Sequence, residues 1–400
     1  MTPGIILGIV GLFLMGFSAT LLLPITVSLV LADGEAGYFA ATLLAILALG
    51  LLLWWPQRHR PFTLHTRHGF LIVALFWTVL GTVSGLPFLL SPSPGLDFTD
   101  AVFESVSGFT TTGATAIVGL DGLPPSLLYY RAQLQFLGGM GIIVLAVAII
   151  PMLGVGGMTL FRAETPGPMK DSKLTPRIAQ TARALWLIYV GLTGACALAY
   201  GLAGMSAFDA ICHAFTTVAT GGFSNYDASF GHFDSALLEG IAILFMFLGG
   251  VNFALHYLVL SEWRPRRYRR DTETRWLVGI CLGTTGLVAV ILALQQVYPD
   301  LPSALRYAAF QVISIITTTG YTTAGFSEWP LFLPILLMYI SFVGGCAGST
   351  AGGMKVIRVQ LLLKQVRREI WRLIHPRSLM PIRIGDHHSD DTAIGAVWAF

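Results

Sequence analysis

Long stretches without a charged residue are the feature that most limits how this chain can fold. They lie near residues 5–31, 38–55, 69–92, 132–153, 184–205, 240–260, 276–297 and 330–354. A helix needs about 20 apolar residues to cross the ~30 Å hydrocarbon core of a bilayer. Only 11% of the residues are charged, too few to cover a soluble protein of 400 residues. The sequence therefore predicts an all-α integral membrane protein that crosses the bilayer several times.

Basic residues are concentrated in four of the segments that separate these stretches, at 58–67, 162–183, 264–275 and 355–383. Of all the lysines and arginines, only Arg131 and Arg306 lie elsewhere. The positive-inside rule places the four segments in the cytoplasm. The opposite side carries an excess of acidic residues, which would concentrate cations at an outer mouth.

A short pattern occurs three times in the chain. It reads FESVSGFTTTG at 103–113, ICHAFTTVATG at 211–221 and FQVISIITTTG at 310–320. Each copy follows a long apolar stretch and an acidic loop, and each is too short to span the bilayer. A Phe-x-Gly-Gly motif follows each copy at a similar distance, beginning at Phe136, Phe247 and Phe342. We predict a repeat unit of outer helix, half-helix, extended Thr-Gly loop and inner helix.

A half-helix that stops inside the membrane leaves carbonyl groups unpaired at its C-terminus. Such groups are tolerated only where they face protein or a water-filled path, and the negative end of the helix dipole favours a cation. Several extended loops around one axis could replace the hydration shell of an ion with carbonyl oxygens. The alternative, that the Thr-Gly pairs only pack helices, explains one copy better than three copies in register.

The third Phe-x-Gly-Gly motif opens a segment that is unusually rich in glycine. We interpret this segment as an intramembrane loop that can obstruct the ion path, although close helix packing is an alternative. A phosphate-binding loop is excluded because Met354 follows Gly353 and no strand precedes it. The predicted gate loop consists of Gly344, Gly345, Cys346, Ala347, Gly348, Ser349, Thr350, Ala351, Gly352 and Gly353.

No set of residues suggests an enzyme, since the chain shows neither a Ser/His/Asp arrangement nor a nucleotide-binding pattern. We expect His213, inside the second half-helix, to be a packed polar residue rather than a ligand. His387 and His388 lie in a polar segment that does not predict metal binding. The basic segment 264–275 fits anionic lipid headgroups or an acidic protein partner better than nucleic acid.

Four segments together resemble the TrkH/KtrB family of potassium transporters, which is related to the plant HKT proteins. They are SGFTTTGAT (107–115), TTVATGGFSN (216–225), ITTTGYTTAGF (316–326) and FVGGCAGSTAGGMKVIR (342–358). The resemblance extends over nearly the whole chain, and an extra N-terminal hairpin points to the TrkH/TrkG branch of the family.

The resemblance implies potassium uptake across the inner membrane of a bacterium, through four pseudo-symmetric repeats around one pore. It also implies a homodimer and a cytosolic, TrkA-like nucleotide-binding ring, with no covalent cofactor. The implied K⁺ ligands are Thr111, Thr112, Ala219, Thr220, Thr318 and Thr319, with Gly113, Gly221 and Gly320 completing the selectivity filter.

On this basis the chain divides into an N-terminal hairpin (1–60), pore repeats 1 (61–161), 2 (175–262) and 3 (273–375), and a linker with the start of a fourth repeat (376–400). Only the beginning of a fourth outer helix is recognisable, at Thr392–Phe400, so we expect the fourth repeat to be lacking. Two alternatives to potassium uptake therefore stay open. One is a non-conducting membrane subunit or scaffold, and the other is a Na⁺- or H⁺-coupled symporter.

Overall fold

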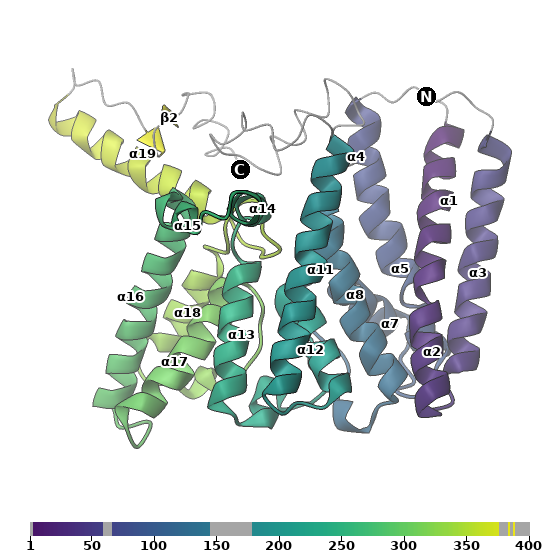
Figure 1. Ribbon diagram of the computed structural model, residues 1–400, viewed down its shortest axis with the longest axis horizontal. Helices are drawn as coiled ribbons and strands as arrows, with labels where there is room; N and C mark the ends of the chain where they lie inside the picture. The colour runs from purple at the N-terminus through teal and green to yellow at the C-terminus, as the bar shows by residue number, and fades with distance from the viewer. Residues whose placement is uncertain (1–2, 59–65, 145–177, 376–382, 385–386, 389–400) are drawn as a thin grey trace.

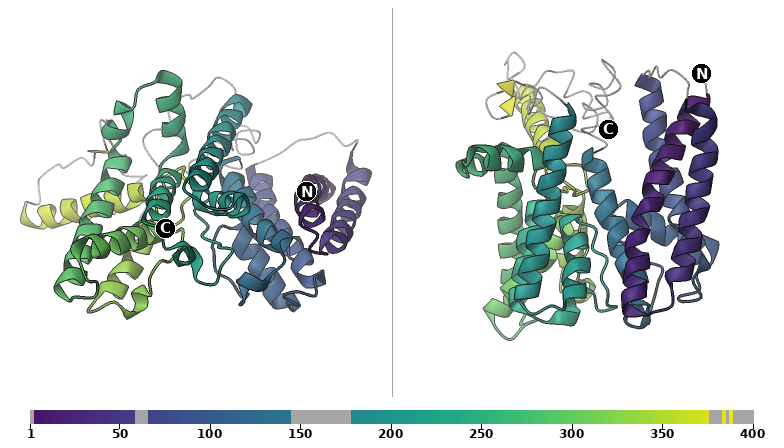
Figure 2. Two further views of the ribbon diagram at one scale, coloured as in Figure 1. Left: turned by 60° about the horizontal axis from the view of Figure 1, so that its bottom comes forward. Right: turned by 45° about the vertical axis from the view of Figure 1, so that its right-hand side comes forward.

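The computed structural model describes residues 3–58, 66–144, 178–375, 383–384 and 387–388. The regular secondary structure of this part of the chain is almost entirely helical, which confirms the predicted all-α class. Its one sheet pairs two strands of two residues each, β1 (Arg383–Ile384) and β2 (His387–His388). The long helices run side by side in one bundle, with basic helices at one end (Figure 1), and Figure 2 shows that they do not lie in a single layer. That end is the cytoplasmic side by the positive-inside rule.

The first three helices form the predicted N-terminal hairpin. Helices α1 (Pro3–Thr20) and α2 (Leu22–Leu31) descend as one nearly continuous span, and α3 (Ala36–Trp54) returns before a short 3₁₀ turn, η1 (Trp55–Gln57). Leu14 and Ile46 are fully buried where α1 packs against α3, and the buried Phe39 ring of α3 packs against Tyr130. Apolar side chains such as Leu44 and Leu52 stay exposed on the outer face, as expected for a surface in contact with lipid.

Three further groups of helices follow the same order. The first comprises α4 (Thr66–Leu75), the π-helical turn η2 (Phe76–Leu80), α5 (Gly81–Val83), α6 (Leu86–Leu90), the half-helix α7 (Phe98–Phe109), η3 (Leu120–Gly122) and α8 (Pro125–Val144). The second comprises α11 (Ile178–Leu202), the half-helix α12 (Ala207–Val218), η7 (Ser229–Phe233), α13 (Ala236–Gly249) and α14 (Phe253–Glu262). The third comprises α15 (Arg266–Arg270), α16 (Thr272–Leu294), the half-helix α17 (Leu301–Ile316), η8 (Phe326–Glu328), α18 (Leu333–Ser341) and α19 (Val356–Ile374).

The three half-helices begin in the same way. At each N-cap a side-chain oxygen accepts a hydrogen bond from the backbone N–H three residues later: Asp97 from Asp100 (2.8 Å), Ser206 from Asp209 (3.1 Å) and Asp300 from Ser303 (2.8 Å). Such caps satisfy N–H groups that a helix cannot pair internally. The half-helices lie in the lower half of the bundle, at the end away from the basic helices (Figure 1).

The apolar stretch 240–260, predicted as one span, is broken. Helix α13 ends at Gly249, and α14 leaves at an angle of 97°. Asn252 starts the new helix by accepting a hydrogen bond from the Ala254 N–H (2.8 Å). The freed backbone groups are paired with the glycine-rich segment, because Gly250 accepts from the Cys346 N–H (2.8 Å) and Gly348 accepts from the Phe253 N–H (3.0 Å).

The stretch 330–354 is also not a continuous helix. Helix α18 ends at Ser341, and regular helix resumes only at Val356. The intervening non-helical segment contains the predicted gate loop, as the glycine density indicated. The five long apolar helices elsewhere in the described part fit the predicted spans 5–31, 38–55, 69–92, 184–205 and 276–297, whereas 132–153 extends beyond the described residues.

Candidate functional site

The three half-helices end in nearly the same backbone conformation. After their C-caps at Thr110, Ala219 and Thr317, one threonine in each loop adopts a left-handed conformation: Thr111 (φ 57°), Thr220 (φ 51°) and Thr318 (φ 56°). The next N–H returns to a carbonyl of the half-helix in each loop, Thr112 to Ser107 (2.9 Å), Gly221 to Thr216 (2.9 Å) and Thr319 to Ser314 (2.8 Å). The repeat found in the sequence is therefore also a repeat of backbone geometry.

In the structure, the second loop aligns with the other two one residue later than its sequence pattern indicated. A glycine with positive φ follows two residues after the left-handed threonine in every loop: Gly113 (φ 78°), Gly222 (φ 77°) and Gly320 (φ 87°). The sequence pattern had aligned Gly221 with Gly113 and Gly320, and Ala219 with Thr111 and Thr318. In the structure Gly222 occupies the glycine position and Ala219 is the helix C-cap, so Thr220 and Gly221 correspond to the threonine pairs of the other loops.

The three loops meet one another. A side-chain carbon placed on Gly113 would overlap the carbonyl oxygen of Gly221 and stand 3.6 Å from the carbonyl oxygen of Thr319. A carbon placed on Gly222 would overlap the Thr319 carbonyl oxygen in the same way. The second and third loops thus each bring a carbonyl against a glycine of the preceding loop, where only a residue without a Cβ fits.

Two threonine hydroxyls in each of the first and third loops are already hydrogen-bonded. The Thr110 and Thr112 hydroxyls lie 2.8 Å apart, as do those of Thr317 and Thr319. Thr110 and Thr317 also donate to helix carbonyls of Val106 and Ile313, each at 2.7 Å. Because these hydroxyls hold one another and the half-helix ends, the groups left to face an ion are mainly backbone carbonyls.

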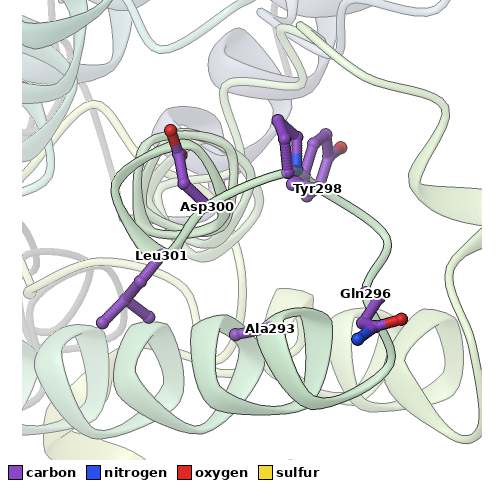
Figure 3. A pocket seen from close by; sticks show the side chains of 6 residues that line it. Ala293, Gln296, Tyr298, Asp300 and Leu301 are labelled. Carbon is purple, nitrogen blue, oxygen red and sulfur yellow. The ribbon is translucent and has the colours of Figure 1, made fainter.

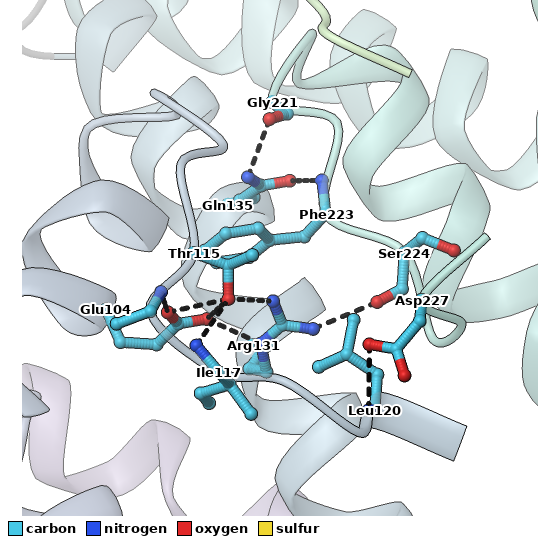
Figure 4. Close-up of polar contacts among 11 residues, drawn as sticks. Glu104, Thr115, Ile117, Leu120, Arg131, Gln135, Gly221, Phe223, Ser224 and Asp227 are labelled. Atoms are coloured by element: carbon cyan, nitrogen blue, oxygen red, sulfur yellow. Dashed lines mark hydrogen bonds and ion pairs between the residues drawn. The ribbon is translucent and has the colours of Figure 1, made fainter. Parts of the chain in front are cut away.

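A buried ion pair holds the first loop to the second (Figure 4). Arg131 on α8 donates through Nε to Glu104 on α7 (2.7 Å), and both side chains are almost completely inaccessible. Arg131 also donates to the Ser224 carbonyl (2.9 Å) and to the Thr115 hydroxyl (3.2 Å). Its guanidinium lies 4.2 Å from the centre of the Phe223 ring, at a distance typical of a cation–π contact.

The sequence reading had noted Arg131 only as a rare basic residue outside the basic segments, and had not connected it with Glu104. A charged residue directly beside a predicted span is a signal in itself, because its burial in the membrane region is costly unless it is paired. The partner, however, lies 27 positions away on another helix.

The predicted gate loop lies directly against the Thr-Gly loops. Thr350 donates its hydroxyl proton to the carbonyls at the end of α12 and α13, Val218 (2.9 Å) and Gly249 (3.0 Å). Its hydroxyl oxygen also accepts from Thr220 (3.3 Å), and the Gly352 N–H donates to the hydroxyl of Thr318 (2.7 Å). Half-helix ends of the second and third repeats are therefore tied to one loop on their cytoplasmic side.

Glu273 anchors this loop at its other side, and the sequence analysis did not identify it. One carboxylate oxygen accepts from the backbone N–H of Ala347 (3.0 Å), within the loop, and of Ile357 (3.1 Å), at the start of α19. Glu273 belongs to the first turn of α16, a different element of the repeat, and is nearly buried. It ties the middle of the loop to the first turn of α19 without being part of the loop.

Other candidate residues are structural. His213 is fully buried, with its ring nitrogens 2.9 Å from the Asp209 carbonyl and 3.1 Å from the Ser224 hydroxyl, in agreement with its predicted packing role. In the part of the chain that the structure describes, no group of three or more His, Cys, Asp or Glu side chains could hold a metal ion. His387 and His388 form β2, and their side chains are not described.

A surface hollow lies where α16 turns into α17, and it contains none of the predicted site residues (Figure 3). Its lining includes Gln296, Tyr298 and Asp300. Hydrogen bonds from Ser303 hold the pKa of the exposed Asp300 carboxyl below its usual value, so this acid stays charged on the outer side. It adds to the acidic character of that side rather than to the site.

The family model and the related proteins that match this chain all belong to one group. The profile of the family described as "TrkH: Cation transport protein" matches residues 37–400. The "Trk system potassium uptake protein TrkH" of Salmonella typhimurium is 53% identical over 98% of this chain and 81% of its own length. The TrkH protein of Halomonas elongata is 53% identical over 100% of this chain and 83% of its own length. The TrkG protein of Escherichia coli is 40% identical over 96% of this chain and 79% of its own length.

A solved structure agrees with the fold. The crystal structure of the potassium transporter TrkH from Vibrio parahaemolyticus superposes with a TM-score of 0.91 at 48% sequence identity, covering 100% of this chain and 82% of that one. The expectation that a fourth repeat is lacking finds no support in these matches, which extend over nearly the whole chain. The residues on which it was based, Thr392–Phe400, lie outside the described part.

Proposed function

Because this chain belongs to the TrkH family of cation transport proteins, we propose that it takes up potassium across the cytoplasmic membrane of a bacterium. It is a multi-pass membrane protein with several helices long and apolar enough to cross the bilayer. One observation supports the proposal most directly. The carbonyl oxygens of Gly221 and Thr319, from two different repeats, both approach the position that a side chain on Gly113 would take in a third.

The ligands that we propose follow the backbone register. They are the carbonyl groups of Thr111 and Thr112, of Thr220 and Gly221, and of Thr318 and Thr319, the two residues after each half-helix C-cap. Ala219 is replaced by Gly221 in this set because it is a C-cap, as Thr110 and Thr317 are. Carbonyls at the negative ends of three half-helices favour a cation, and they can replace water around K⁺ without a bound cofactor.

The two alternatives make different predictions in one uptake experiment. The protein should restore growth of potassium-uptake-deficient cells at low external K⁺ and should take up a rubidium tracer in competition with K⁺. A scaffold would do neither, although it would still reach the membrane. A coupled symporter would lose uptake when the Na⁺ or proton gradient is removed. Absence of uptake with confirmed membrane insertion would refute the proposed function.

We further propose that residues 344–353 act as a gate beneath the ligands. Their hydrogen bonds to Val218, Thr220 and Thr318 hold the segment across the cytoplasmic side of the half-helix ends. Deleting Ala347–Ala351 should therefore raise the K⁺ flux at constant protein amount and leave the K⁺/Na⁺ permeability ratio unchanged. Glu273→Gln, which weakens the anchor outside the loop, should raise flux to a smaller extent. A lower flux in a correctly inserted deletion variant would make the segment a packing element.

The remaining proposals concern organisation and partners. We propose the TrkH/TrkG branch, repeat bounds at 61–161, 175–262 and 273–375, a homodimer, and a TrkA-like nucleotide-binding ring on the cytoplasmic side. Helix α15 supports a cytosolic partner because it presents exposed arginines at the cytoplasmic end of the bundle (Figure 1). Such a patch attracts acidic surfaces at low ionic strength.

Charge reversal of Arg266, Arg269 and Arg270 to Glu should weaken co-purification with an acidic regulatory ring while basal K⁺ uptake persists. Arg267 is left unchanged because it pairs with Glu262 at 2.6 Å. Lipid headgroups are the competing explanation of the charge. In that case the variant would retain the ring and instead lose binding to vesicles that contain anionic lipid.

A further inference from the structure

We infer that Gln135 is a positioning residue for ion selectivity. It belongs to α8 of the first repeat, but its side chain holds the selectivity loop of the second repeat. The inference rests on the proposed potassium uptake and adds a residue that touches the loop rather than the ion. Two hydrogen bonds of the Gln135 side chain support it, together with the position of Gly222 between the two backbone groups that they hold.

The amide of Gln135 bridges two backbone groups of the second loop. Its Nε2 donates to the Gly221 carbonyl (2.8 Å), and its Oε1 accepts from the Phe223 N–H (3.0 Å). Gln135 is fully buried, so neither bond competes with bulk water. A single planar group thus fixes the backbone on both sides of Gly222 (Figure 4).

Gly222 is the residue at which the second loop meets the third. It has φ 77°, and a carbon on it would overlap the Thr319 carbonyl oxygen. On its other side, the carbonyl oxygen of Gly221 approaches Gly113 of the first loop. A rotation of the peptide units around Gly222 would therefore move carbonyls at two junctions between loops, and Gln135 is placed to prevent it.

The same helix face holds the next part of the loop. Arg131 lies one helical turn before Gln135, so their side chains project in the same direction. Arg131 donates to the Ser224 carbonyl and lies over the Phe223 ring, and Glu104 balances its charge. Together the two side chains anchor residues 221–224 to the first repeat, which leaves the loop little freedom to adapt to a smaller ion.

Gln135 is a positioning residue because it does not need to contact the ion. A carbonyl oxygen has two lone pairs, so the Gly221 oxygen can accept from Gln135 and still coordinate K⁺. Loss of the amide should consequently change which ion is preferred more than whether the protein folds. This separates its role from that of a residue that only supports the fold.

The test compares two glutamines of one helix. Gln133, two residues earlier, is equally buried and also donates to a backbone carbonyl, but to Thr20 of the N-terminal hairpin (2.9 Å). We expect Gln135→Leu to lower the K⁺/Na⁺ permeability ratio roughly three- to tenfold, as for loss of one or two hydrogen bonds. Gln133→Leu should leave the ratio at the wild-type value. Permeability ratios in proteoliposomes measure both.

If Gln135→Leu does not insert into the membrane, a second variant, Gln135→Glu, tests the inference. Gln135→Glu keeps the acceptor for Phe223, but it can donate to Gly221 only when protonated. Its K⁺/Na⁺ ratio should therefore rise as the pH falls from 8 to 5.5, relative to the wild type, which contains the same Glu104–Arg131 pair and controls for other effects of pH. The inference is overturned if Gln135 variants keep the wild-type ratio at every pH, or if Gln133→Leu lowers it equally. Failure of the wild type to transport K⁺ would instead refute the proposed function.

Discussion

Gly113→Ala is expected to remove most of the discrimination between K⁺ and Na⁺. Gly113 has φ 78°, and the added carbon would overlap the Gly221 carbonyl oxygen. The backbone cannot accommodate both atoms, so at least one of the two loops must move away from its place in the ring of carbonyls. We expect the K⁺/Na⁺ permeability ratio to fall by about tenfold or more, the equivalent of ~1.4 kcal/mol of differential binding.

The control for this variant is Gly119→Ala in the same connection. Gly119 also has a positive φ, 82°, but a carbon placed on it meets no heavy atom within 4 Å. Both substitutions share the cost of a left-handed residue with a Cβ, about 1–2 kcal/mol. Only Gly113→Ala adds the collision with a neighbouring loop. Equal permeability ratios in the two variants would show that backbone strain, rather than contact between loops, determines the effect.

Arg131→Met should strongly destabilise the protein. The substitution leaves the buried Glu104 carboxylate without its partner at 2.7 Å. Removal of one partner of a buried ion pair costs about 3–5 kcal/mol, because the remaining charge is uncompensated. The free energy of unfolding, measured in detergent micelles by denaturant titration, should fall by that amount. The thermal unfolding midpoint should fall with it.

Two further variants identify the cause of this loss. Arg267→Met breaks the exposed pair with Glu262, whose side chains are more than one-third accessible, and should cost less than about 1 kcal/mol. The double variant Glu104→Gln/Arg131→Met removes both charges and should regain part of the stability lost by Arg131→Met alone. A double variant less stable than either single variant would mean that the contacts of Arg131 with Ser224 and Phe223 matter more than the charge.

The sequence by itself determined several features of this protein. The charge-free stretches predicted a helical membrane protein, because their length matches the bilayer core. The threefold Thr-Gly pattern predicted the half-helices, whose caps at Asp97, Ser206 and Asp300 begin them in the same way. The glycine density after Phe342 predicted the break between α18 and α19. These signals lie within continuous segments, and they are found either from the composition of one segment or by comparing its sequence with that of another.

Only the tertiary structure decided which residues of different repeats meet. The hydrogen bonds of Gln135 with Gly221 and Phe223, and of Glu273 with the gate loop and the start of α19, join elements that are more than 70 positions apart in the chain. The break of 240–260 at Gly249 likewise depends on the gate loop, which pairs the freed backbone. No pattern within one segment contains that information.

The register of the second loop shows most clearly why local sequence was not enough to decide the structure. Gly221 and Gly222 are adjacent, and either could adopt a positive φ without steric cost, so the sequence leaves two alignments open. In the folded protein the Thr319 carbonyl occupies the space where a side chain on residue 222 would lie, and Gln135 pairs the backbone on both sides of it. Local conformational preference sets which backbone angles are allowed, whereas contacts between distant segments select the one that is used.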